Sequence, residues 1–146
     1  MPNLKEDNCI EILQLYTLED WKPLFDLIPL IKNEKQFGEF NFEQKGSTIT
    51  KMHWELKEIA SKFHKICYEM PIVIAFDWEK FDEGRKIASD SNFDYDTIDI
   101  PTKCKILTAI IRNDRFCDGA LVGAFDSGLI LKILRSIEKE LTITSK

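Results

Sequence analysis

The chain has 146 residues, 44% of them apolar and 31% charged, with a formal net charge of −5 at pH 7. A chain of this length and composition is typical of one globular domain, which buries about 68–70% of its unfolded surface and needs no disulfide or metal for stability. Because phosphate binding requires a basic face, the acidic balance argues against nucleic acid as the main partner.

Four cysteines are scattered along the chain: Cys9, Cys67, Cys104 and Cys117. Their spacings match neither a zinc site nor a CxxC redox motif. Each lies among apolar residues, which is typical of free, buried thiols in a reducing compartment. We therefore expect reduced thiols, no bound metal and no cofactor.

Two segments bear on the cellular location. Residues 5–7 are Lys, Glu and Asp, whereas a signal peptide needs an apolar run near the start of the chain. The longest apolar run, residues 72–76, is much shorter than the ~20 residues of a membrane-spanning helix. We expect a cytoplasmic protein that does not cross a membrane.

Helices are predicted for the first part of the chain. Apolar residues at helical spacing indicate a short helix over residues 8–16. Either Thr17 or Asp20 can cap the next helix, and we favour Asp20, because Pro23 then falls in the first turn, where a missing N–H costs little. Pro29 should kink or end that helix.

Residues 37–51 show the weakest helical signal. Phe40 and Phe42 alternate with polar residues, a period of two that suits a half-buried strand, and Gly46 can provide a turn. A small β-hairpin near residues 39–50 and an ordered loop explain this pattern equally well. Since isolated hairpins are weak, a hairpin here should lean on the helices.

A long helix is predicted next. Pro71 should end it, and apolar residues keep helical spacing over its five turns at Met52, Leu56, Ile59, Phe63, Ile66 and Met70. The β-branched run at residues 72–76 is either a buried connector or a lone strand. Asp77 should cap a further helix that ends near Ala88.

Acidic residues dominate the segment 90–99. It starts like a calcium-binding loop, but Tyr95 stands where that loop requires glycine and Pro101 where it requires glutamate. We therefore expect a solvated loop, with Asp99 as the cap of the following helix.

The segment 104–128 organises the second half of the chain. Its first part is an amphipathic helix, with Thr108 outside the apolar stripe. Asp118 can cap a short helix rich in Gly and Ala, in which Gly123 indicates the close approach of another backbone. Gly128 should end that short helix.

The last helix should bury an apolar stripe that runs from Ile130 to Leu141, and it should fray over residues 142–146. No internal repeat or low-complexity tract divides the chain. These elements predict a mainly α protein: one compact domain over residues 1–146 with six or seven helices and room for the hairpin near residues 39–50.

The segment FDWEKFDEGR is the strongest candidate for chemistry. Trp78 offers a stacking face, and three carboxylates follow within about one and a half helical turns at Glu79, Asp82 and Glu83. Like charges this close can raise one pKa and create an acid/base pair, provided that water is excluded. Acids at a helix start also complement the helix dipole, and we favour this structural interpretation.

The segment RNDRF is the second candidate. Arg112 and Arg115 flank Asp114 and could grip a phosphate or a carboxylate. They could equally pair with Asp82 or Glu83 and join two helices, and the two interpretations stay open. A buried arginine needs a partner, so we expect Arg115 to contact one of these two carboxylates.

His64 and Cys67 lie three residues apart on one predicted helix and could form a thiolate pair. Cys67 also belongs to the apolar side of that helix, so we favour a structural thiol. The sequence contains no HExxH, GxSxG, P-loop or dinucleotide-binding motif.

The charged segments also carry a resemblance. FDWEKFDEGR, LTAIIRNDRFCDGAL and SGLILKIL together resemble a family of small bacterial proteins known only as a domain of unknown function. The resemblance extends from Leu18 to Ile137, and RFCDG is its most specific part. It implies a bacterial, cytoplasmic single domain and carries no activity, cofactor or catalytic residue.

For the function we favour a non-catalytic binding or interaction module with a cleft of arginine, carboxylate and tryptophan. The alternative is a small hydrolase or lyase with Asp82 or Glu83 as acid/base and Arg115 holding an anion. The expected partner is a small ligand or a protein, and a homodimer is compatible with the sequence. The candidate site residues are Trp78, Asp82, Glu83, Arg85, Arg112, Asp114, Arg115 and Phe116.

Overall fold

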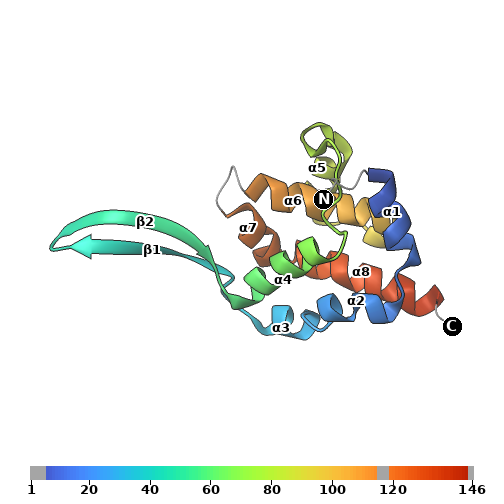
Figure 1. The fold of residues 1–146 in the computed structure, drawn as a ribbon, viewed down its shortest axis with the longest axis horizontal. Helices are drawn as coiled ribbons and strands as arrows, with labels where there is room; N and C mark the ends of the chain where they lie inside the picture. The colour runs from blue at the N-terminus through green and yellow to red at the C-terminus, as the bar shows by residue number, and fades with distance from the viewer. Residues whose placement is uncertain (1–5, 115–118, 145–146) are drawn as a thin grey trace.

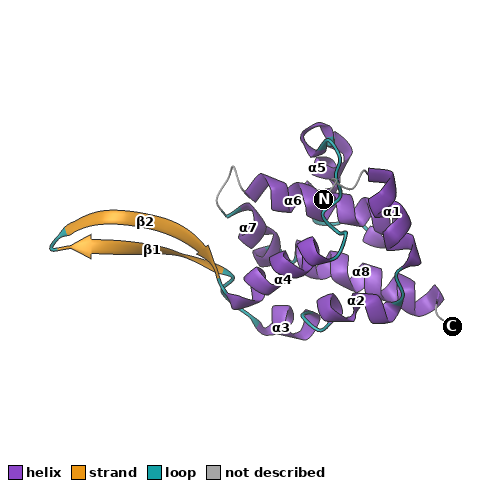
Figure 2. Ribbon diagram, in the orientation of Figure 1, coloured by secondary structure: helices purple, strands orange, loops and turns teal. Residues whose placement is uncertain are grey.

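A computed structural model describes residues 6–114 and 119–144 of the chain. Helices form the body, and two antiparallel strands form a hairpin that projects from it (Figures 1 and 2). The predicted mainly α fold with a hairpin is confirmed. In chain order, with η for a single 3-10 turn, the elements are α1 (Glu6–Leu15), α2 (Leu18–Phe25), α3 (Ile28–Asn33), β1 (Gly38–Lys45), β2 (Thr48–Leu56), α4 (Glu58–Glu69), η1 (Trp78–Lys80), α5 (Asp82–Ser89), η2 (Tyr95–Thr97), α6 (Ile100–Asp114), α7 (Ala120–Asp126) and α8 (Leu129–Thr144).

The core is built around α8, which packs against α2, α3, α6 and α7. Its predicted apolar stripe is completely buried at Ile130, Ile133, Leu134 and Ile137. Burying each such side chain contributes roughly 1.5–3 kcal/mol. The helix continues to Thr144, past residue 142, where we expected fraying to begin.

The apolar run after α4 is a buried connector and not a strand. Its residues Ile72 and Ile74 are 0% and 1% exposed. The hydroxyl oxygen of Thr108 on α6 accepts from the backbone N–H of Ile74 at 3.0 Å and lies 2.8 Å from the carbonyl oxygen of Ile72. Thr108 is therefore fully buried and fastens the connector to α6, which corrects its predicted place outside the apolar stripe.

The predicted five-turn helix is wrong in its first part. Residues Met52 to Leu56 belong to β2, and α4 begins only at Glu58. Apolar residues at positions 52, 54 and 56 fit a period of two as well as helical spacing, and the ladder with β1 decides for the strand. The hairpin consequently extends beyond the predicted residues 39–50.

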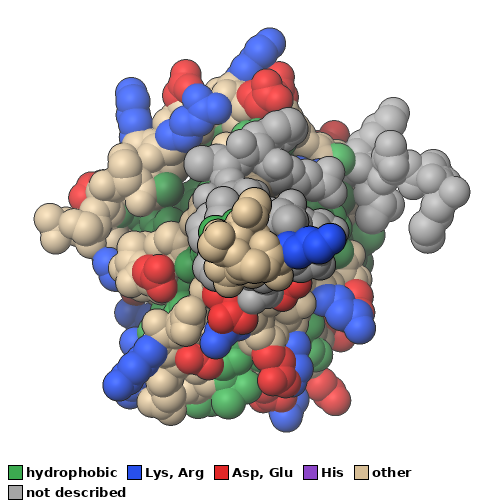
Figure 3. All heavy atoms as spheres, turned by 90° about the vertical axis from the view of Figure 1, so that its left-hand side faces the viewer, with side chains coloured by type: hydrophobic (Ala, Val, Ile, Leu, Met, Phe, Trp, Pro, Cys, Tyr) green, Lys and Arg blue, Asp and Glu red, His purple; other side chains and the backbone are tan. Residues whose placement is uncertain are grey.

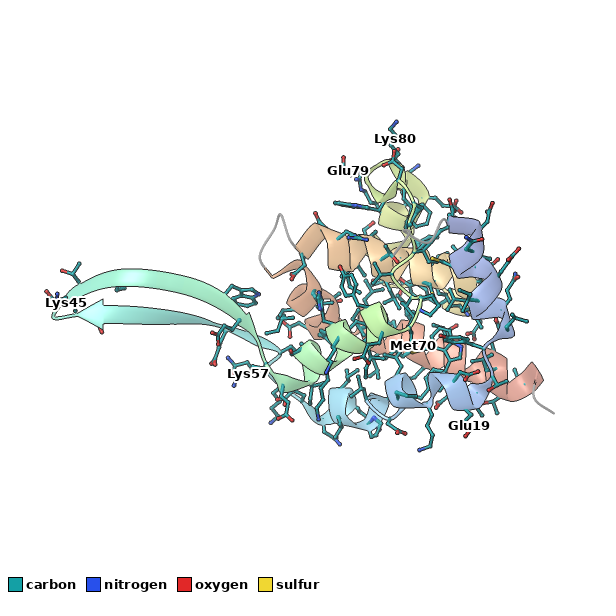
Figure 4. All side chains as sticks on the ribbon, viewed as in Figure 1. Glu19, Lys45, Lys57, Met70, Glu79 and Lys80 are labelled. Carbon is teal, nitrogen blue, oxygen red and sulfur yellow. The ribbon has the colours of Figure 1, made fainter. Side chains whose placement is uncertain are left out.

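The base of the hairpin packs against the body. A Cβ on Gly38 would lie only 2.6 Å from Cζ2 of Trp54 and 2.7 Å from Cγ2 of Val122, a residue of α7. Figure 4 labels Lys57 at this base and Lys45 at the far tip. The expectation that the hairpin leans on the helices therefore holds at its base, while the rest of the hairpin stands away from them (Figure 1).

Thr17, and not Asp20, is the N-cap of α2. Asp20 supports the cap, because its Oδ2 accepts from the backbone N–H of Thr17 at 2.8 Å. A hydroxyl residue followed three positions later by an acid resembles a capping box. Pro23 consequently lies inside the helix rather than in its first turn, and Pro29 opens α3.

The helix predicted from Asp77 is divided in two. Trp78–Lys80 form the single turn η1, and α5 starts after Phe81. Gly84 allows this arrangement, because a Cβ at that position would overlap the ring of Phe81. The predicted end near Ala88 is confirmed to within one residue, since α5 ends at Ser89.

The acidic segment 90–99 forms turns that its own aspartates hold. Asp90 and Asp94 each accept from the backbone N–H two residues further on, at 3.0 Å. Asp99 caps α6 as predicted, since its Oδ1 accepts from the N–H of Thr102 at 2.9 Å.

In residues 6–114 and 119–144, no cluster of three His, Cys, Asp or Glu side chains is arranged to hold a metal, and no helix has both the length and the apolar composition of a membrane span.

Candidate functional site

A groove of about 530 Å³ opens on the body between α5, α6 and α7. Short side chains and apolar side chains make up most of its lining. We call it the α5–α7 groove, and the described residues that line it are Trp78, Gly84, Arg85, Ala88, Ser89, Ile106, Ala109, Ile110, Asn113, Ala120, Gly123, Ala124, Ser127 and Leu129.

The groove exists because three helices present small residues to one another. On α6 the lining residues follow one helical stripe, and they are Ile106, Ala109, Ile110 and Asn113. From α5 and α7 come the small residues Gly84, Ala88, Ala120, Gly123 and Ala124. Side chains this short cannot fill the space between helix axes about 8–10 Å apart, so a hollow remains.

Gly123 therefore does not mark a close helix crossing, as its sequence context had indicated. It is exposed, and a Cβ built on it would meet no atom within 4 Å. Among the described glycines, close packing occurs instead at Gly38 and Gly84. The second half of the predicted central segment thus shapes a surface hollow, while Gly128 ends α7 with a φ of +82°, as predicted.

Replacing Gly123 by alanine should raise the free energy of unfolding by about 0.5–1 kcal/mol, because alanine loses less backbone freedom in a helix and the new methyl group meets no neighbour. For a chain of this size the melting temperature should rise by roughly 2–4 °C, measured by circular dichroism. A fall in the melting temperature would mean that another segment does pack closely on Gly123.

Two of the predicted site residues, Trp78 and Arg85, line the groove. They lie seven positions apart, Trp78 on η1 and Arg85 one turn into α5. The guanidinium of Arg85 donates from Nη2 to the carbonyl oxygen of Glu79 at 2.5 Å and from Nη1 to Oδ1 of Asp82 at 3.4 Å. Arg85 is thus held at the groove by contacts within its own segment.

Asp82 and Glu83 occupy the first turn of α5 and are exposed. The side chain of Asp82 is 78% exposed, and its ion pair with Arg85 is a solvent-screened surface pair. General acid/base catalysis by neighbouring carboxylates needs a site from which water is excluded, and both of these side chains are exposed to solvent. Their position fits the interpretation that we favoured, an acidic helix start that complements the helix dipole.

Arg112 and Asp114 do not line the groove and contact other parts of the chain. The guanidinium of Arg112 lies over the ring of Tyr68 on α4, 5.9 Å from its centre. Oδ1 of Asp114 accepts from the backbone N–H of Leu121 at 3.0 Å, so Asp114 caps α7 from the end of α6. The expected cap Asp118 lies outside the described residues.

Three further predictions also lie outside the described residues. Arg115 and Phe116 belonged to the candidate site, and Cys117 was expected to be a buried thiol. The predicted contact of Arg115 with Asp82 or Glu83 therefore stays a prediction. The structure brings Trp78 and Arg85 of the candidate set together at one groove. Asp82 and Glu83 lie between them in the sequence but are not among the lining residues.

Comparison with known proteins adds a family and no activity. A model described as a family of unknown function (DUF6508) matches residues 16–142. The chain belongs to this family. The match confirms the resemblance between Leu18 and Ile137 and extends it slightly at both ends. Neither a curated protein nor a solved structure matches the chain.

In this DUF6508 chain, the surroundings of Cys67 disfavour the thiolate that a nucleophilic pair with His64 needs. Cys67 is completely buried, and this burial raises the pKa of its thiol well above the usual value, with a smaller contribution from Cys104. The ring of His64 packs against Tyr68, with 5.0 Å between the ring centres. Cys9, Cys67 and Cys104 are free, buried thiols, as predicted.

Most of the groove residues of the DUF6508 chain were missed in the sequence. The polar lining residues Ser89, Asn113 and Ser127 carry no local signal that separates them from ordinary surface residues. The run of small residues around Gly123 was the available signal, and it predicts a close helix crossing as readily as a hollow. Only the positions of the neighbouring helices distinguish the two.

Proposed function

We propose that this protein is a non-catalytic binding module that takes a small, mainly apolar ligand with an anionic group into the α5–α7 groove. The observation that carries the proposal is the groove itself, with Trp78 and Arg85 in a lining of small and apolar residues. Its volume of about 530 Å³ falls in the range of small-molecule sites, roughly 300–1,000 Å³. Such sites combine an apolar lining with a few polar groups that orient the ligand.

The charge of the groove supports an anionic group on the ligand. Among the described residues that line the groove, Arg85 alone carries a charge. A guanidinium has five N–H donors, and the contacts of Arg85 with Glu79 and Asp82 engage two of them. The contact with Asp82 is long and exposed, so a carboxylate on a ligand can compete with it.

The indole of Trp78 supports a ligand that has a flat apolar part. Trp78 is half-buried at the groove, and an indole stacks well on other rings or on flat apolar surfaces.

We further place the protein in the cytoplasm, because its three described cysteines are free and such thiols persist in a reducing compartment. The arrangement favours binding over the hydrolase or lyase alternative, because Asp82 and Glu83 are exposed to solvent and do not line the groove.

A titration with phenylacetate and its neutral analogue phenylacetamide tests this proposal. In ¹H–¹⁵N NMR spectra, phenylacetate should shift the indole N–H of Trp78 and the amides of Ala109 and Gly123. Phenylacetamide should bind more weakly by roughly tenfold, because a hydrogen bond to a charged group contributes about 1.5–3 kcal/mol, part of which the amide retains.

Two variants decide which residues are responsible. Arg85→Gln should remove the preference for phenylacetate over phenylacetamide, whereas Lys86→Gln, an equal loss of charge outside the groove lining, should preserve it. Gly123→Leu should weaken the binding of both probes, because the new side chain extends into open space at the groove. Shifts that avoid α5, α6 and α7, or a preference that survives Arg85→Gln, would refute the proposal.

A further inference from the structure

The hairpin belongs neither to the packed helical body nor to the α5–α7 groove. We call residues 38–56 the arm. Figures 1 and 2 show the arm as a curved, two-stranded ribbon that extends away from the helices. An isolated two-stranded hairpin is at best marginally stable in water, and stability normally requires a third strand or a covering element. Each strand of the arm also has one outer edge of backbone groups outside the β1–β2 ladder.

The register divides the arm into two kinds of cross-strand pair. One kind consists of apolar residues and glycine, and these pairs are Gly38 with Leu56, Phe40 with Trp54, and Phe42 with Met52. The other kind is polar and alternates with the first: Glu39 with Glu55, Asn41 with His53, and Glu43 with Lys51. Residues directly opposite each other share one face of a sheet, so the arm is amphipathic.

We propose that two copies of this chain pair through the outer edges of their β2 strands, antiparallel about a two-fold axis at His53. The two arms then form one four-stranded sheet. In this register Lys51 lies opposite the partner's Glu55, and Glu55 opposite the partner's Lys51. Met52 lies opposite the partner's Trp54, so the apolar positions of the two arms become continuous.

Charge complementarity favours β2 over β1 as the joining edge. The corresponding two-fold register of β1, centred on Asn41, would set Glu39 against the partner's Glu43, and like charges directly opposite each other are destabilising. The self-complementary edge is therefore that of β2.

The shape of the arm fits the same register. The ladder jumps from the pair Glu43–Lys51 to the pair Gln44–Ile49, which leaves Thr50 as a bulge. A bulge bends a strand and ends regular pairing, so it sets the limit of the joined edge at Lys51 and turns the tip aside. Figure 3 looks along the arm onto the body and shows acidic and basic side chains intermixed on the face around it, which a second copy can approach without facing a single sign of charge.

Sedimentation equilibrium on the full chain tests the proposal. The wild type should be a dimer. Lys51→Glu and Glu55→Lys should each weaken dimerisation by at least about tenfold, because each turns two attractive cross-strand pairs into repulsive ones. An equimolar mixture of the two variants should regain the dimer. In the mixed dimer the glutamate introduced at position 51 faces the lysine introduced at position 55 of the other chain, and the native Glu55 and Lys51 face each other at the symmetry-related position.

The controls separate the register from net charge and from misfolding. Lys45→Glu at the tip of the arm changes the net charge as Lys51→Glu does and should leave the dimer intact. Recovery in the mixture shows that both variants fold, and circular dichroism checks each alone. A monomeric wild type, a dimer that resists both reversals, or a mixture that stays monomeric would overturn the proposal. Resistance to both reversals would favour packing of the apolar faces instead.

Discussion

Replacing Thr108 by valine should lower the free energy of unfolding by about 2–4 kcal/mol, although the two side chains have nearly the same shape. The hydroxyl of Thr108 accepts from the N–H of Ile74 and lies within hydrogen-bonding distance of the carbonyl of Ile72. Both isoleucines are buried, so water cannot replace the lost partner. Each buried polar group left unsatisfied costs about 1–3 kcal/mol.

Urea unfolding measures this effect, and Thr142→Val is its matched control. Each threonine has its Oγ1 close to the carbonyl oxygen four residues back, at 2.8 Å from Cys104 for Thr108 and at 2.7 Å from Glu138 for Thr142. Thr142, however, is exposed on α8 and contacts no connector. Its replacement should change the free energy of unfolding by less than about 0.5 kcal/mol. Equal effects of the two substitutions would show that Thr108 holds no connector in place.

Thr108 also shows where sequence reasoning ends. Helical periodicity predicts which side of α8 is buried, because a stripe of isoleucines and leucines has no other stable place. A threonine between apolar residues of α6 does not by itself indicate whether its side chain is buried or exposed. Its burial depends on the connector at residues 72–76, which comes from more than thirty positions earlier and supplies the backbone groups that the hydroxyl satisfies.

The strand at Met52 to Leu56 illustrates a second limit. Spacings of two and four residues belong both to a strand and, in part, to a helix, so the apolar pattern alone extended the following helix too far towards the N-terminus. The alternation at Phe40 and Phe42 did indicate the first strand. What decides the second strand is its pairing with the first, a long-range property that a local pattern leaves open.

The candidate site was predicted in part for a similar reason. Trp78 and Arg85 come from one segment, so their proximity follows from local structure, and both reach the groove. Arg112 was grouped with them by its charge. On α6, however, the stripe that includes Asn113 faces the groove, and Arg112, one residue earlier and about 100° around the helix, lies over Tyr68 instead. The rotation of α6 about its axis is set by packing and not by any residue nearby in sequence.

The second large effect is expected at a buried lysine. Lys103 on α6 is 0% exposed, and its Nζ lies 3.5 Å from Oε1 of Glu140 on α8, whose side chain is 38% exposed. Among the described residues, Nζ of Lys103 makes no direct hydrogen bond. Its charge also reaches Asp96: hydrogen bonds from Lys139 and Ser136 lower the pKa of that carboxyl, and the charges of Lys139 and Lys103 lower it further.

Glu140→Gln should lower the free energy of unfolding by about 2–3 kcal/mol, because it removes the carboxylate nearest to a fully buried ammonium group. Breaking one side of a fully buried pair costs about 3–5 kcal/mol, and the partial exposure of Glu140 reduces that figure. Glu138→Gln, a like substitution half a turn away on α8, is the control and should stay within about 0.5 kcal/mol of the wild type in urea unfolding.

Lys103→Met should behave in the opposite way. Methionine fills a similar volume with an unbranched apolar chain, and replacing a buried charge by a well-packed apolar residue is often neutral or stabilising, by about 1–4 kcal/mol. The double variant Lys103→Met/Glu140→Gln should consequently be more stable than Glu140→Gln alone, because no charge is then left without its carboxylate. If Lys103→Met instead destabilises the protein as much as Glu140→Gln does, the attraction between the two charges exceeds the cost of burying the ammonium group. The ion pair between Lys103 and Glu140 would then make a net stabilising contribution to the contact between α6 and α8.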